Sequence, residues 1–291
     1  MEVKELTKSY PTKTVCKVLG VSRSGYYQYR RGISHKRSKS EETIAKKVQE
    51  VFSEHKRRYG ARRIHAELKH QGERIGLHKV RKLMKIEQLA AIQPRSFVPR
   101  TTVSPRGLSA CENLLMKEES ISEPNQAWVG DITYIPLMNG KYVYLASWED
   151  LCSRQVKGWS LESSMPDDLI IRALQRGLTQ YSPKEGLIVH SDRGGQYFSK
   201  EFRKLLAANK CRQSMAGVDN PYENAMAESF WSRLKTELLQ GGVFETIEDA
   251  RVEIFEYIEG YYNTKRRHSG IGYRTPDEFE TQFYISNVGK Y

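Results

Sequence analysis

Three acidic residues stand where they could act on a phosphodiester. Asp131 lies inside the alternating stretch AWVGDITYIPL, Asp192 directly follows the apolar run GLIVHS, and Glu228 lies in NAMAESFWSRLKTELL. Carboxylates aimed at one point repel one another unless a cation lies between them, and hard oxygen ligands select Mg²⁺ or Mn²⁺. Two such ions, about 3.5–4 Å apart, would activate a water or sugar hydroxyl for in-line attack on the phosphorus. Any single acid in a chain with 35 of them is more often a solvated side chain.

The segments around these acids predict how they are positioned. Arg-Gly-Gly after Asp192 lets the backbone turn sharply and clears bulk from beside the carboxylate. In the helix expected over 222–240, Glu228 borders the buried stripe, and Lys235 and Asn224 share its side. Lys235 could touch a phosphate or balance charge. His190 points to the same side as Asp192, either to orient the metal ligands and approach the phosphate, or as a packed, hydrogen-bonded strand histidine.

The order of the predicted elements defines the fold class. Two alternating stretches flank the Asn-Gly of a hairpin turn, a third strand follows, and helices and strands then alternate. The expected strands are 127–137, 142–150, 154–163, 186–192 and 211–216, and the expected helices are 166–181, 199–209 and 222–240. This order predicts an α/β domain, a mixed sheet with helices over its faces.

The basic charge is concentrated in the first third of the chain. Residues 1–110 hold 26 Lys and Arg against 9 Asp and Glu, a net charge of +17, whereas residues 111–291 hold 21 against 26. Residues 12–30 have a helix-turn-helix pattern, and a helical hairpin packed on its neighbour is the alternative. A helix is expected over 41–53 and two more follow it. Their basic residues lie away from the apolar stripes and are predicted to contact DNA phosphates, although a solvated basic surface is the alternative: Arg62, Arg63, Arg81, Lys82 and Lys85.

The domain boundaries follow from composition. Residues 1–93 are predicted as a helical, helix-turn-helix-like DNA-binding region, 94–123 as a Pro-containing linker, and 124–291 as the catalytic core with a basic, helical tail. In that tail, Lys265, Arg266, Arg267 and His268 are predicted to contact DNA phosphates near the active site. The four cysteines lack paired spacing, and no apolar run reaches the length of a membrane span. We therefore expect a soluble, cytoplasmic protein with no membrane partner.

Four motifs closely resemble, in order and spacing, the second-reading-frame transposases of the bacterial insertion-sequence-three family. They are AWVGDITYI, HSDRGGQY, NPYENAMAESFWSRLKTELL and YYNTKRRHSGIGYRTPDEF, and YGARRIHAELKHQG with HKVRKLM resembles that family's upstream DNA-binding segment. The resemblance implies a retroviral-integrase-like, ribonuclease-H-like core. It also implies that Asp131, Asp192 and Glu228 form the acidic triad, with 35 residues between the last two, and that Lys235 is the helix lysine. Gly130 departs from the Thr of many members and should alter strand packing or a hydrogen bond near the site.

The resemblance also implies the reaction and its partners. The implied reaction is Mg²⁺-dependent nicking at the ends of a mobile element, followed by attack of the freed 3′-hydroxyl on another phosphodiester. The implied partner is double-stranded DNA, both the element's ends and the target. Joining two ends requires at least a dimer on DNA, where the protein would associate with the nucleoid. Family members usually work fused to an upstream-frame partner protein. The alternatives are a DNA-binding protein that has lost catalysis, an integrase or nuclease that never joins strands, and, least of all, a tyrosine recombinase.

Overall fold

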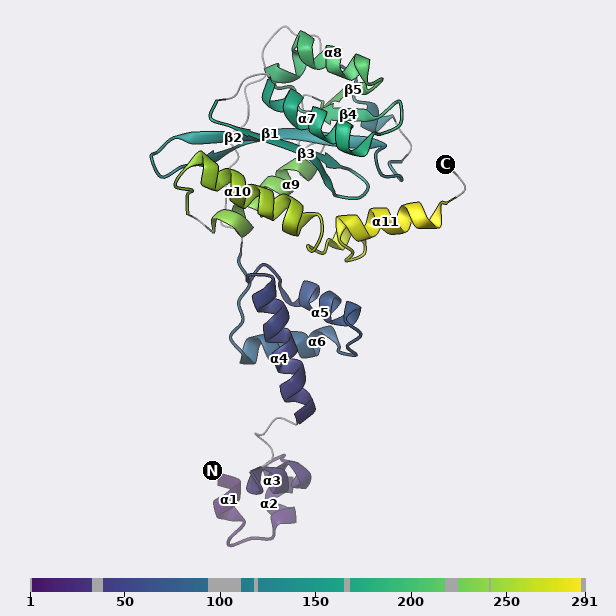
Figure 1. Ribbon diagram of the computed structural model, residues 1–291. Coiled ribbons are helices and arrows are strands. Elements are labelled where there is room, and N and C mark those ends of the chain that lie inside the picture. The colour runs from purple at the N-terminus through teal and green to yellow at the C-terminus, as the bar shows by residue number, and fades with distance from the viewer. Residues whose placement is uncertain are drawn as a thin grey trace. The chain divides into compact units, whose positions relative to one another are not determined.

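The computed structural model describes residues 2–32, 39–93, 111–117, 120–164, 168–217, 225–240 and 242–288. The chain divides into two units, Met1–Ala90 and Ala91–Tyr291, and each is described by itself (Figure 1). None of the helices that the structure describes is long and apolar enough to cross a membrane.

The first unit is entirely helical over its described residues. Its helices are α1 (Glu2–Leu6), α2 (Thr12–Val18), α3 (Arg23–Arg30), α4 (Lys39–Glu54), α5 (Ala61–His70) and α6 (Leu77–Ile86). Helices α4, α5 and α6 pack on one another through the apolar stripes predicted from the sequence, including Ile64, Leu68 and Val80, which are fully buried. In α2, Val15 and Cys16 are buried, whereas Val18 is 77% exposed.

The second unit contains a mixed five-stranded sheet. Its strands are β1 (Ala127–Pro136), β2 (Tyr142–Asp150), β3 (Val156–Glu162), β4 (Ile188–Ser191) and β5 (Arg212–Met215). They lie in the order β3-β2-β1-β4-β5. The β1–β2 and β2–β3 pairs are antiparallel, and the β1–β4 and β4–β5 pairs are parallel. The predicted mixed α/β sheet is therefore confirmed.

Helices cover both faces of this sheet (Figure 1). The helices described in this unit are α7 (Asp168–Tyr181), α8 (Lys200–Ala208), α9 (Ala225–Leu234), α10 (Ile247–Tyr257) and α11 (Pro276–Ser286), with the π-helices η4 (Lys235–Leu239) and η5 (Ile258–Tyr262) and the short 3-10 helices η1 (Leu114–Met116), η2 (Gly195–Phe198) and η6 (Ser269–Ile271). One core lies under α7 and α8 and includes Trp128 and Trp148, and the other lies under α9 and α10 and includes Phe230 and Trp231. Successive β1 residues therefore face different cores, since side chains alternate along a strand.

Part of the predicted linker belongs to the second unit. The backbone N–H of Leu114 donates to Ser214 Oγ at 2.9 Å, and the N–H of Met215 donates to the carbonyl of Glu112 at 3.4 Å. The prediction that 94–123 is a linker was therefore wrong for the segment around η1, which packs against the edge strand β5. Residues 94–110 lie outside the described ranges.

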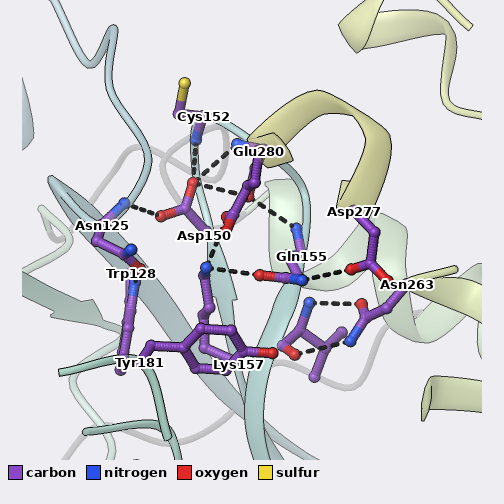
Figure 2. Close-up of polar contacts among 12 residues, drawn as sticks. Asn125, Trp128, Asp150, Cys152, Gln155, Lys157, Tyr181, Asn263, Asp277 and Glu280 are labelled. Atoms are coloured by element: carbon purple, nitrogen blue, oxygen red, sulfur yellow. Dashed lines mark hydrogen bonds and ion pairs between the residues drawn. The ribbon is translucent and has the colours of Figure 1, made fainter. Parts of the chain in front are cut away.

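A buried polar network attaches α11 to the sheet (Figure 2). The Lys157 side chain on β3 is fully buried, and its ammonium lies 2.6 Å from Glu280 Oε1 and 4.1 Å from the ring centroid of Tyr181. The Gln155 side chain connects β3 to α11. Its Oε1 accepts from Lys157 Nζ and its Nε2 donates to Asp277 Oδ1, both at 2.6 Å. Removing one partner of a buried ion pair is strongly destabilising, so α11 is an integral part of this unit.

Candidate active site

Asp131 and Asp192 lie side by side on neighbouring parallel strands. Gly130 on β1 pairs with Ser191 on β4, and the two aspartates are the next residue along each strand. Asp131 is inside β1, whereas Asp192 follows the carboxyl end of β4, where open α/β sheets place their sites. Both side chains are half-buried. Two of the three predicted acids therefore meet at one place on the sheet.

Asp131 is held by hydrogen bonds from two directions. Its Oδ2 accepts from the indole N–H of Trp231 on α9 at 3.1 Å, and its Oδ1 accepts from the backbone N–H of Ile132 at 2.7 Å. The indole contact also shows which core the carboxylate faces, because Trp231 belongs to the core under α9 and α10. The adjacent Gly130 faces the other way, where a Cβ would lie 2.4 Å from a Trp148 ring atom. The space that a side chain at position 130 would occupy is therefore filled by the Trp148 indole of β2.

Asp192 is fixed by the loop that follows it. Its Oδ1 accepts from the backbone N–H of Gly194 at 2.9 Å, and Arg193 Nε donates to the carbonyl of Ala216 at 2.8 Å. Burial raises the pKa of the Asp192 carboxyl, and the Gly194 hydrogen bond lowers it in part. The expected sharp glycine turn is absent at Gly194, whose φ of −61° suits any residue. The absence of a side chain at Gly194 instead leaves room for the Asp192 carboxylate, since a Cβ there would lie 3.0 Å from Asp192 Oδ1.

A lysine and a tyrosine also reach this pair. Burial lowers the pKa of Lys235, and the Asp131 carboxylate raises it in part, so the ammonium lies within electrostatic reach of that aspartate. It also lies 4.5 Å from the ring centroid of Tyr134 on β1. The buried hydroxyl of Tyr197 has no hydrogen-bond partner among the described residues. Burial, and then Asp192 and Asp131, raise the pKa of Tyr197, so this phenol stays neutral beside the two carboxylates.

Glu228 lies on the helix that contacts Asp131, but it does not complete a three-acid group. It is exposed in the first turn of α9, one helical turn before Trp231. Within the described ranges, no three His, Cys, Asp or Glu side chains form a group that could hold a metal ion. The structure thus brings Asp131, Asp192 and Lys235 together and leaves Glu228 at the solvent edge of the same helix.

The two residues predicted to surround the metal ligands have different outcomes. His190 is fully buried, and its Nδ1 lies 2.8 Å from Ser214 Oγ on β5. This is the packed strand histidine that the sequence left as an alternative. Asn224 lies outside the described residues.

The prediction that the basic cluster of the tail contacts DNA phosphates was wrong for three of its four residues. Arg266, Arg267 and His268 are 1%, 5% and 4% exposed, so they do not present a surface to DNA. Arg266 forms an ion pair with the buried Glu237 of η4, and Arg267 Nη1 lies 3.1 Å from Glu278 Oε2. Both arginines are buried because their guanidinium groups pair with acids of the same unit. Lys265 is exposed.

The basic residues of α5 and α6 have surface positions. Arg62, Arg81, Lys82 and Lys85 are exposed, and Arg63 is half-buried with its guanidinium 5.8 Å from the ring centroid of Tyr59. All five lie on helices whose opposite side is apolar and buried.

Sequence reasoning did not identify three aromatic residues that lie at this site. Trp231 belongs to the buried stripe of its helix, and its indole N–H reaches Asp131. Tyr197 and Tyr134 were not singled out, although one lies beside both aspartates and the other beneath Lys235. The only signal for Tyr197 was its place in the HSDRGGQY motif.

Three family models match this chain. Two are described as an integrase core domain and match residues 121–221 and 209–276, and one is described as an HTH-like domain and matches residues 39–97. Together these ranges include Asp131, Asp192 and Glu228 and the basic helices α5 and α6.

Individual proteins are also similar. The transposase for insertion sequence element IS904 of Lactococcus lactis is 41% identical over 239 residues, which are 82% of this chain and 94% of the relative. Transposase InsF for insertion sequence IS3A of Escherichia coli is 38% identical over 275 residues, covering 94% and 95%. The magnesium-bound catalytic core of the HTLV-2 integrase aligns at a TM-score of 0.42 and 16% identity, covering 54% of this chain and 97% of that one.

Proposed function

Because this chain belongs to the insertion-sequence-three family of transposases, we propose that Asp131, Asp192 and Glu228 are the acids that carry its DNA strand cleavage and strand transfer. The observation that carries the proposal is the register of β1 and β4, which sets Asp131, in the middle of β1, beside Asp192, at the carboxyl end of β4. Two acids that are far apart in the sequence and unrelated in function would not be expected to become neighbours in the fold.

The chemistry of this pair fits a hard divalent cation. Two half-buried carboxylates lie together, and burial alone raises the pKa of Asp192, because its charge is poorly compensated by the protein. A divalent cation at this position would offset both charges, as oxygen ligands of this type do for Mg²⁺ or Mn²⁺. Two such ions, held by Asp131, Asp192 and Glu228, would supply activation of the attacking oxygen and stabilisation of the leaving oxygen.

The protein's own residues orient the acids. Trp231 and the Ile132 N–H hold Asp131 in one rotamer, and the Gly194 N–H holds Asp192. Lys235 lies within electrostatic reach of Asp131 and would contact a DNA phosphate. Glu228 is one turn from Trp231 on α9, and we propose that this helix brings the Glu228 carboxylate to the pair when metal and DNA bind.

The same residues would serve two consecutive reactions on double-stranded DNA. Water attacks the phosphodiester at an end of the insertion sequence, the P–O bond to the 3′ oxygen breaks, and a free 3′-hydroxyl remains. That hydroxyl then attacks a phosphodiester of the target, and the displaced target 3′ oxygen takes up the proton that the attacking hydroxyl loses. No covalent intermediate with the protein is needed.

The DNA is held mainly by the basic helices. The five cations of α5 and α6 are proposed to bind phosphates, together with Lys265. Joining two ends requires two sites, so the working species is at least a dimer on DNA. We also propose an upstream-frame partner protein and action at the nucleoid in the bacterial cytoplasm.

The test is cleavage of a duplex that carries the terminal sequence of the element, with Mg²⁺ present. The wild-type chain should nick the duplex and join the freed end to a second DNA. Asp192→Asn should lose both products while it keeps its fold and DNA affinity, and Asp168→Asn, at the exposed start of α7, should keep both. Full activity of the Asp192→Asn protein would exclude the proposed acids, and nicking without joined product would indicate a nuclease.

A further inference from the structure

The first three helices form a small module with its own core. None of the three family matches includes residues 2–32. Helix α3 packs through Tyr26, which is 4% exposed, and α2 contributes the buried Val15 and Cys16. The Tyr26 hydroxyl lies 2.6 Å from Thr7 Oγ1, just after α1, so all three helices are connected through one side of α3.

The connection between α2 and α3 has the form of a helix-turn-helix. Gly20 takes a left-handed φ of +65°, and the N–H of Val21 donates to the carbonyl of Cys16 at 2.9 Å, which ends α2. Ser22 then caps α3, because its Oγ accepts from the Gly25 N–H at 3.1 Å. Four residues thus reverse the chain between a seven-residue and an eight-residue helix.

The outward side of α3 has side chains that suit base edges. At about 100° per residue, Ser24, Tyr27, Gln28 and Arg31 fall on one stripe opposite Tyr26. All four are exposed, and Tyr27 is 44% exposed. Glutamine can bond adenine through two atoms and arginine can do the same with guanine, while serine bonds several bases. Three of the four side chains on this stripe can therefore form directional hydrogen bonds with base edges.

The charge of this module complements DNA. Residues 2–32 contain seven Lys and Arg against two Glu, a net charge of +5. Exposed cations flank the polar stripe, with Arg23 and Arg30 on α3 and Lys17 at the end of α2. Such residues can bind the phosphates on either side of a groove while the stripe faces the bases.

We propose that residues 2–32 are a sequence-reading DNA module, in which α3 enters the major groove and Gln28 and Arg31 contact base edges. This inference rests on the proposed action of the chain on DNA and assigns different parts of DNA binding to different helices. The cations of α5 and α6 supply affinity for any duplex, and α3 supplies the preference for particular base pairs.

The test is selection of binding sites by the full chain from a pool of randomised duplexes, with EDTA present so that no cleavage occurs. The wild type should enrich a motif. The double variant Gln28→Ala, Arg31→Lys keeps the net charge, but it loses both two-atom contacts. It should lose preference at neighbouring base pairs by roughly ten-fold or more, with unchanged affinity for the unselected pool. The single Arg31→Lys variant should lose preference at one position only.

The controls separate this inference from catalysis and from folding. Arg30→Lys lies on the same helix outside the stripe and should select the wild-type motif. Circular dichroism should show equal helix content and melting temperature for all variants. The proposal is overturned if the double variant enriches the wild-type motif with the same preference, or if the wild type enriches none. Either result leaves the cleavage test intact, because that test depends on the acids and on Mg²⁺.

Discussion

Trp231 donates its indole N–H to the Asp131 carboxylate at 3.1 Å and so connects helix α9 to strand β1 at the candidate site. The same helix carries Glu228 one turn earlier and leads into the π-helix that begins at Lys235. This hydrogen bond therefore links Asp131 directly to the helix that carries Glu228. π-Helical turns inside α-helices are frequent at functional sites.

Trp231→Phe should weaken metal-dependent cleavage beyond its effect on stability. The ring still packs in the core, but Asp131 loses a hydrogen bond, worth about 1.5–3 kcal/mol when one partner is charged. We expect the Mg²⁺ concentration for half-maximal cleavage to rise by roughly ten-fold or more. Trp159→Phe is the matched control, because that indole donates to Glu259 at 2.9 Å in the same core. Equal Mg²⁺ dependence in the two variants would rule out a special role for Trp231.

Gly130→Thr should destabilise the second unit, because a Cβ at this position would lie 2.4–2.6 Å from atoms of the Trp148 ring. Overpacking of this kind costs about 1–3 kcal/mol. Trp148→Phe should relieve part of the clash, so the double variant should be more stable than the sum of the single effects predicts. Gly260→Ala, at a position open to solvent, should have little effect. Additive losses in urea titrations would contradict this packing argument.

Glu149 should make stability depend on pH. It is buried on β2, its Oε2 has no hydrogen-bond partner in the described part of the chain, and burial raises its pKa from 4.5 to about 7. Between these values the folded state keeps a proton that the unfolded state has released, so stability falls as pH rises, by up to about 3 kcal/mol. The stability of Glu149→Gln relative to wild type should therefore increase from pH 4.5 to 7.5. A difference that does not change with pH would contradict the raised pKa of Glu149.

Arg266→Met should destabilise the fold by about 3–5 kcal/mol, because it leaves the buried Glu237 carboxylate without its cation. The double variant Arg266→Met, Glu237→Leu should recover much of this loss. Lys265→Met, next to it but exposed, should change stability by no more than about 0.5 kcal/mol. If Arg266→Met instead had wild-type stability and bound DNA poorly, the result would support a DNA contact by Arg266 and contradict its structural role.

The sheet was largely predictable because its strands alternate and its hairpin has an Asn-Gly turn. The pairing of Asp131 with Asp192 was not predictable from spacing alone, since strand order decides which acids become neighbours. Helix α10 was not predicted, although Thr246 and Asp249 form a capping box at its start. That pair was a usable signal for the helix.

Burial of charged residues was the main failure of sequence reasoning. Lys265, Arg266 and Arg267 form one run in the sequence, but only the first is exposed. Their partners, Glu237 and Glu278, lie on other elements, so no local pattern distinguishes a paired arginine from a solvated one. The neighbouring tyrosines at 261 and 262, which are buried, were the only local hint of a core position.

The most direct measurement is anomalous scattering from Mn²⁺ in crystals of the full chain bound to a duplex. The proposed site predicts manganese peaks in contact with Asp131 and Asp192, with the Glu228 carboxylate reaching the same ions. The Asp131→Asn, Asp192→Asn double variant should lose these peaks. Manganese bound elsewhere, or a Glu228 carboxylate that remains remote from ions held by the two aspartates in the DNA complex, would contradict the assignment of this acidic triad.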